Sequence, residues 1–105
     1  MVIGERVMKK NIDVYRINSD ISCRIEGSNE IILYNPDIDD LIIINSSALE
    51  IWRFLETSHS VDEICAHLVG LFTEHPEKEV LIQDIMSFLD KLGEGYICKE
   101  KRHES

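Results

Sequence analysis

Residues 31–52 read IILYNPDIDDLIIINSSALEIW, and this stretch decides the fold. Its two apolar runs, 31–34 and 41–44, are strand-like, and the Asn-Pro-Asp sequence after the first run is a turn signal. The apolar period then changes from two to 3.6, and Ser47 with Glu50 matches a capping box at a helix start. The stretch therefore predicts a β-hairpin that runs directly into a helix.

The segment upstream supplies one more strand. Residues 21–25 alternate apolar and polar side chains, which is the period of a half-buried strand. The Gly-Ser-Asn sequence at 27–29 is turn chemistry. Three short strands joined by short turns predict an antiparallel meander.

Two further helices are expected downstream. Ser60 and Glu63 form a second capping-box pattern ahead of an apolar helical stripe. Pro76 suits the first position of a third helix, and Gly93 suits its end. We expect residues 96–97 to fold back onto the core.

The order of these elements predicts one α+β domain that is winged-helix-like: a three-stranded antiparallel sheet followed by three helices. We expect a flexible arm at 1–10, a single domain at 11–98 and a tail at 99–105. The 105 residues contain no apolar run near the roughly 20 residues that span a bilayer. The chain start also lacks a signal-peptide pattern, so we expect a cytoplasmic location.

Both faces of the expected sheet are apolar, because 31–34 and 41–44 do not alternate and successive strand residues point to opposite faces. The helices can cover only one face. A homodimer needs more surface than this sheet offers, so we expect the N-terminal segment to cover the other face and the protein to be a monomer or weak homodimer. The apolar residues of that segment are Ile12, Val14, Tyr15 and Ile17.

Charge separates the middle of the chain from its ends. Residues 18–97 hold four bases and sixteen acids, a net charge of −12, whereas 1–17 carry +2 and 98–105 carry +1. A body this acidic suits basic partners and is a poor match for nucleic-acid phosphates. The expected third helix, 77–92, has a net charge of −2. Charge therefore disfavours the alternative interpretation, a winged-helix regulator that binds DNA.

No residue pattern indicates catalysis, a cofactor or a metal. Cys23, Cys65 and Cys98 are scattered singly, whereas structural zinc sites usually have paired ligands a few residues apart. Cys65 lies on an apolar helical stripe, where a free cysteine behaves as a small hydrophobe. The chain has no nucleophile elbow, phosphate-binding glycine loop or His-Glu-x-x-His motif. We therefore expect a protein that is not an enzyme and binds no cofactor.

A set of short motifs runs in order along the chain. They are Arg24-x-Glu26-Gly27, Ile32-Leu33-Tyr34-Asn35-Pro36, Ile44-Asn45-Ser46-Ser47-Ala48, Ile51-Trp52 with Leu55, Ser60-Val61-Asp62-Glu63-Ile64 with Leu68, Asp84-Ile85-x-x-Phe88-Leu89-x-x-Leu92, and Gly95-Tyr96-Ile97. In order and spacing, residues 21–97 resemble the PqqD family, coenzyme PQQ synthesis protein D and its relatives. One departure is the stretch at 56–59, where the family usually has a glycine.

The resemblance implies a peptide recognition element that binds the leader of a ribosomally synthesised precursor peptide. Family members present this leader to a modifying enzyme, often a radical SAM protein, and have no catalytic residues. The leader adds as a strand to the third strand and lies against the third helix. The implied partners are thus a precursor peptide and a modifying enzyme, with no nucleic acid and no membrane. Carried over, the peptide-binding residues are Asp39, Asp40, Leu41, Ile42, Ile43, Ile44, Gln83, Asp84, Ser87, Phe88 and Lys91.

Overall fold

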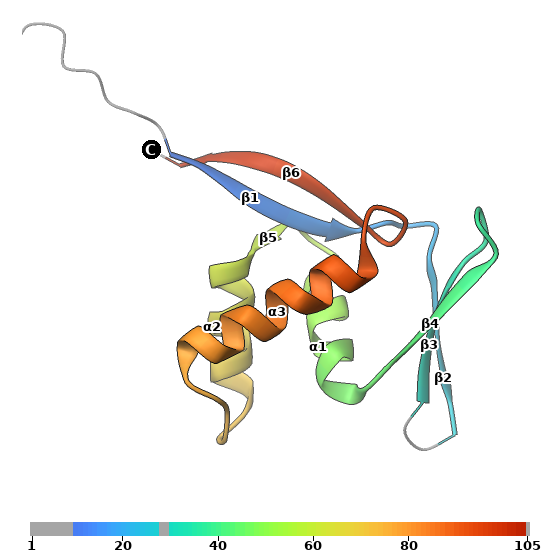
Figure 1. Cartoon of the computed structure of the whole chain (residues 1–105), viewed down its shortest axis with the longest axis horizontal. Helices are drawn as coiled ribbons and strands as arrows, with labels where there is room; N and C mark the ends of the chain where they lie inside the picture. Colours follow the sequence, from blue (N-terminus) through green and yellow to red (C-terminus); the bar gives the residue numbers. More distant parts are fainter. Residues whose placement is uncertain (1–9, 28–29, 105) are drawn as a thin grey trace, which may run out of the picture.

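The computed structural model describes residues 10–27 and 30–104, which form three helices and two small sheets (Figure 1). The elements are β1 (Lys10–Ile17), β2 (Ser22–Glu26), β3 (Glu30–Asn35), β4 (Asp40–Ile44), α1 (Ser46–Phe54), β5 (His59–Ser60), α2 (Val61–Leu71), α3 (Lys78–Leu92) and β6 (Ile97–Glu104). The α+β class is therefore confirmed.

Strands β2, β3 and β4 form the expected antiparallel meander, with β3 at its centre. Ile31, Leu33 and Ile44 are buried on one face of this sheet, which packs against the helices. Leu41 and Ile43 point to the opposite face and are 55% and 54% exposed. The helices thus cover one face of the sheet and leave the other open.

The core lies between the inner sheet face and the three helices. Leu33, Leu55, Ile64 and Ile85 are fully buried there, and Cys65 packs among them, as its place on the apolar stripe predicts. Tyr96 and Ile97 are also buried, so the expected return of the chain onto the core is confirmed.

The helix starts differ in part from the sequence-based expectation. The capping box of Ser60 and Glu63 is present at α2, and Gly93 ends α3 with φ 66°. For α1 the capping residue is Asn45 and not Ser47, because the Asn45 Oδ1 accepts the Ala48 N–H at 2.8 Å.

Helix α3 begins two residues after the expected first position, Pro76. Its first helical bond runs from the Leu81 N–H to the Glu77 carbonyl at 2.9 Å. Glu77 is therefore the N-cap, although its side chain makes no capping hydrogen bond. Pro76 thus lies just outside the helix, in the connection from α2.

A second sheet joins the two ends of the described chain. All eight residues of β1 pair with β6, from Lys10 with Glu104 to Ile17 with Ile97, and β5 pairs with the other side of β1. We call the β1–β6 pair the ribbon; in Figure 1 it runs above the helices. The N-terminal segment does not cover the outer sheet face as expected, because β6 satisfies its backbone groups while Tyr15 and Ile17 pack against the helical core.

The ribbon contains residues that the sequence predicted to be a flexible arm and a tail. Residues 99–104, expected to be a tail, complete β6, and Lys10, expected in the arm, opens β1. Residues 1–9 of that arm lie outside the described residues. The winged-helix likeness is approximate, because the ribbon joins strands from opposite ends of the chain rather than forming a local hairpin after α3. None of the helices among the described residues has the length and apolar character that a membrane crossing requires.

Candidate peptide-binding edge

Strand β4 forms a free edge of the β2–β3–β4 sheet. Within residues 10–27 and 30–104, one side of β4 pairs with β3 and no strand pairs with its other side. In an antiparallel strand, alternate residues point their N–H and C=O groups away from the paired neighbour. An edge with such open groups is a template for an added strand.

The segment after α3 holds the end of the β3–β4 hairpin in place. Asn35 and Asp40 pair across the two strands, and both bond to this segment. The Asn35 Nδ2 donates to the Gly95 carbonyl at 2.6 Å, and the Tyr96 hydroxyl donates to the Asp40 Oδ2 at 2.9 Å. Burial, followed by the hydrogen bond to Asp40, raises the pKa of Tyr96 to about 12, so this hydroxyl remains a donor at neutral pH. The start of β4 is therefore held by contacts on both strands.

The start of β4 is also acidic. Asp39 adopts a positive φ of 51° and accepts the Tyr34 hydroxyl at 2.8 Å. This hydrogen bond raises the pKa of Tyr34. Asp39 and Asp40 are both exposed to solvent, so an approaching peptide meets two carboxylates at this end of the strand. Such rim charges favour a basic partner.

A cavity of about 430 Å³ opens where β4 ends. Asn45 follows β4 directly and lines this cavity, together with Ala48 from α1 and Phe72 from the end of α2. Helix α3 contributes Asp84 and Phe88. The edge of β4 therefore leads to a mostly apolar hollow that contains the carboxylates of Glu74 and Asp84.

The structure brings together part of the expected peptide-binding set. Asp84 and Phe88 line the cavity, whereas the exposed Gln83, Ser87 and Lys91 of α3 do not. Residues 39–44 supply the edge itself. Within this stretch Ile44 is buried and Ile42 is half-buried against the core, so β4 offers a ligand mainly its backbone and its exposed side chains.

The sequence did not identify the part of the cavity that α1 and the α2–α3 connection form. Asn45, Ala48 and Phe72 were not expected at the site, but the structure places them there. A local signal did exist for Asn45, because asparagine is a preferred N-cap and stands directly after the apolar run. No local signal marks Phe72 as a cavity residue, because its position depends on how α2 packs.

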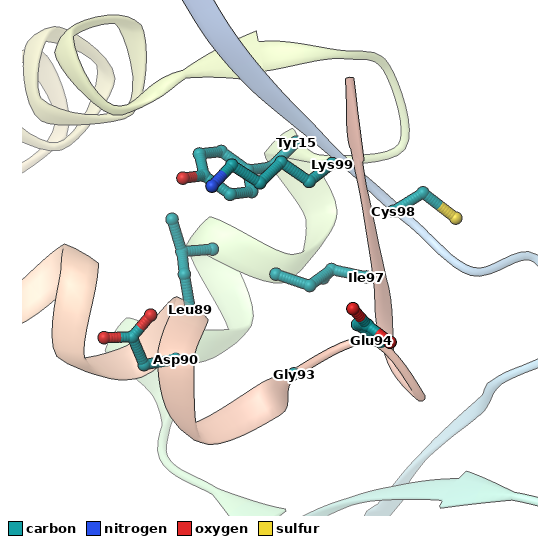
Figure 2. Close-up of a pocket in the computed structure, with 8 residues that line it drawn as sticks. All are labelled: Tyr15, Leu89, Asp90, Gly93, Glu94, Ile97, Cys98 and Lys99. Atoms are coloured by element: carbon teal, nitrogen blue, oxygen red, sulfur yellow. The ribbon is translucent and has the colours of Figure 1, made fainter. Parts of the chain in front are cut away.

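A second cavity, of about 470 Å³, lies between the ribbon and the end of α3 (Figure 2). Tyr15 and Lys99 pair across the ribbon and face Leu89 and Asp90 of α3. The Lys99 amine lies 3.5 Å from the Asp13 carboxylate, which neutralises part of its charge. None of the expected peptide-binding residues lines this cavity, so it is separate from the β4 edge.

The cysteines and other metal-ligating side chains are dispersed. Cys65 is buried in the core, and Cys23 and Cys98 are exposed and free. Across the described ranges 10–27 and 30–104, no three His, Cys, Asp or Glu side chains are grouped so that they could hold a metal ion. The candidate site therefore consists of the open edge of β4 and the cavity at its end.

Comparison with known proteins supplies one match. The family model described as coenzyme PQQ synthesis protein D (PqqD) matches residues 30–96, which is more than half of the chain. The match begins at β3 and ends at Tyr96, so it contains β4, the cavity and α3 but not the ribbon. No curated protein and no solved structure matches the chain at the significance threshold.

Proposed function

Because the chain belongs to the PqqD family, we propose that it is a non-catalytic chaperone for a precursor peptide. It binds the leader of a ribosomally synthesised peptide by strand addition and presents it to a separate modifying enzyme, a radical SAM protein. The observation that carries this proposal is the unpaired side of β4, which leads into the cavity beside α3.

Binding combines a sequence-blind contact with a selective one. Backbone hydrogen bonds to β4 give affinity to any extended segment, because every peptide carries the same N–H and C=O groups. Selectivity comes from the cavity, where an apolar leader side chain can pack against Phe88 and Ala48. The proposed contact set is the one that the family resemblance supplied: residues 39–44 with Gln83, Asp84, Ser87, Phe88 and Lys91.

Charge supports a leader with basic residues near these contacts. Asp39 and Asp40 stand at one end of β4, and Asp84 lines the cavity at the other. A leader that places Lys or Arg near these carboxylates associates faster at low salt, because long-range attraction steers the encounter. The same charges work against the binding of acidic peptides.

Chemical-shift mapping tests this function directly. We expect the amide signals of residues 39–45 and 81–91 to shift when the isotope-labelled chain is titrated with the leader of its precursor peptide. A scrambled leader of the same composition is the control, and it should bind more weakly because its side chains no longer fit the cavity. Shifts confined to β6 or to the loop before β5 would contradict strand addition at β4.

A pair of proline variants separates backbone pairing from side-chain contacts. Ile42→Pro and Ile43→Pro each remove one N–H from β4, and the two N–H groups point to opposite sides of the strand. The variant whose lost N–H faces outward should remain folded by circular dichroism and lose leader binding. Normal leader binding by both folded variants would exclude strand addition at this edge.

A further inference from the structure

The outer face of the β2–β3–β4 sheet carries a mainly apolar surface that extends beyond the peptide edge onto β3 and β2. The strand register places Ser22, Tyr34 and Leu41 in one cross-strand row. It places Arg24, Ile32 and Ile43 in the next row, and these six side chains define what we call the outer patch. A shallow hollow of about 490 Å³ lies on this face, between Arg24, Ile32 and Tyr34.

We propose that the outer patch is the docking surface for the modifying enzyme, which presents to it an apolar centre rimmed by Lys or Arg. This inference rests on the proposed peptide function. It goes further, because it assigns to the enzyme the sheet face opposite the helices, which shares Leu41 and Ile43 with the peptide edge.

The ends of the outer patch indicate the charge of the partner. At one end Glu26 and Glu30 pair across β2 and β3, which places two like charges opposite each other. Arg24 forms a 2.7 Å ion pair with Glu26 and leaves Glu30 as the excess charge. At the other end the exposed Asp37 and Asp39 follow β3. An apolar centre between two acidic ends is complementary to a partner whose apolar surface has basic side chains on its rim.

A second copy of the chain fits this surface poorly. Three strands of five residues give an area of roughly 15 by 17 Å, or about 250 Å², whereas a stable interface buries about 800 Å² on each partner. Both ends of the patch are acidic, so two copies stacked face to face place acids against acids in either orientation. The small area therefore requires a partner that also contacts surface beyond the patch, and the acidic ends favour a basic partner.

The position of the leader explains why this partner is the enzyme. A leader strand added to β4 extends the same sheet, so alternate leader side chains join the outer face beside Leu41 and Ile43. The added strand widens the surface by about 4.8 Å. A protein that covers the outer patch then contacts the chain and the bound peptide together. This arrangement brings the enzyme to its substrate and makes its affinity greater when the leader is bound.

The test measures binding of the purified radical SAM enzyme that modifies the precursor peptide to the full chain, with and without the leader. Ile32→Lys places a charge at the centre of the patch, on a strand that does not contact the leader. Glu30→Lys reverses the charge of an exposed rim residue without changing a core side chain. Val69→Lys on α2 is the matched control, since Val69 is an exposed apolar residue away from the sheet.

We expect Ile32→Lys to weaken enzyme binding about tenfold or more, because an unpaired cation then sits in a desolvated contact. Glu30→Lys should weaken it a few-fold, mainly through slower association. Val69→Lys should bind as the wild type does. Enzyme binding by Ile32→Lys and Glu30→Lys that equals the wild type would overturn the proposal.

Two further readouts separate this inference from the proposed function. A direct leader titration reports the peptide site by itself, and both sheet variants should bind the leader as the wild type does. Failure of the wild type to bind leader would refute the chaperone function, whereas loss of enzyme binding in the variants would still support the docking surface. Sedimentation velocity tests the remaining alternative, that a second copy of the chain covers the patch. If the wild type is a dimer and Ile32→Lys is a monomer, the patch is a dimer interface and the proposal is refuted.

Discussion

At the scale of single residues, the Gly95 carbonyl links segments that are far apart in the sequence. It accepts the Asn35 amide at 2.6 Å and the Asn18 amide at 3.3 Å. Asn35 is buried, and its Oδ1 also accepts the Asp37 N–H at 2.9 Å, so its amide is satisfied at both ends. A Cβ at Gly95 would lie 3.2 Å from the Asn35 Nδ2, so a larger residue here would have to displace the Asn35 amide. These contacts hold the hairpin whose outer strand is the proposed peptide edge.

Replacing Asn35 should therefore lower the free energy of unfolding more than replacing Asn18 does. We expect Asn35→Ala to lower the free energy of unfolding by about 2 kcal/mol, because it leaves buried hydrogen-bonding groups unsatisfied. Asn18→Ala, the matched control, loses a longer bond to Gly95 and the exposed acceptor of the Asp20 N–H, and should lower the free energy of unfolding by about 1 kcal/mol or less. Urea unfolding measures both values. Equal costs for the two variants would contradict the assignment of Asn35 as the main contact.

At the scale of elements, Glu63 couples the start of α2 to the ribbon. Its Oε1 accepts the Ser60 N–H at 2.9 Å and forms a 3.1 Å ion pair with Arg102 of β6. The hydrogen bond from Ser60, followed by that from Arg102, lowers the pKa of Glu63 to about 2. One carboxylate thus caps a helix and holds a strand from the far end of the chain.

This coupling predicts that the stability of the folded protein depends on pH. Because the folded-state pKa of Glu63 is lowered, its stabilising effect is complete above its unfolded pKa of 4.5 and is lost as pH falls toward 2. Glu63→Gln retains a capping amide but removes the charge. We expect this variant to be about 1 kcal/mol less stable than wild type at pH 7, a value reduced by the partial exposure of the side chain.

The difference between Glu63→Gln and wild type should shrink as pH is lowered from 4.5 to 3. Urea midpoints measured across this range provide the test. Asp62→Asn, an exposed change in the same first turn, is the control and should show a smaller change with pH. A stability difference for Glu63→Gln that stays constant down to pH 3 would rule out the charge as its cause.

At the scale of the whole molecule, negative charge dominates the body and the ribbon is the basic part. Three of the ribbon cations are already engaged: Lys101 pairs with Asp13, Arg102 with Glu63, and Arg16 lies 3.8 Å from Glu100. On the body, the exposed Asp84 and Asp90 give α3 a negative surface. The charge distribution therefore favours basic peptides and proteins over nucleic acids.

We accordingly expect no saturable binding to duplex DNA at physiological salt. Non-specific DNA-binding proteins have dissociation constants of roughly 1–100 µM under these conditions, and this chain should bind more weakly than that range. Fluorescence anisotropy with a labelled duplex measures the affinity. In the same assay, binding of a labelled leader peptide to the chain shows that the preparation is active. Tight, sequence-selective binding would instead favour the winged-helix regulator.

Local patterns in the sequence predicted most of the secondary structure. The unalternating runs at 31–34 and 41–44 predicted β3 and β4, and Ser60 with Glu63 predicted the start of α2. These features could be read locally because strand alternation, helical period and capping depend on residues within a few positions of each other. The free edge of β4 also followed from the expected meander, since a three-stranded open sheet must have two edges.

Only the tertiary structure decided the ribbon, the cavity and the open outer sheet face. The sequence of β6, ICKEKRHE, is rich in charged residues that are uncommon in strands, so its pairing with β1 carried no local signal. That pairing joins residues eighty or more positions apart through backbone bonds and ion pairs such as Lys101 with Asp13. Because β6 pairs with β1, the outer sheet face remains open among the residues that the structure describes. The cavity likewise arises where α1, α2 and α3 meet, and their relative packing is a property of the folded chain rather than of any one segment.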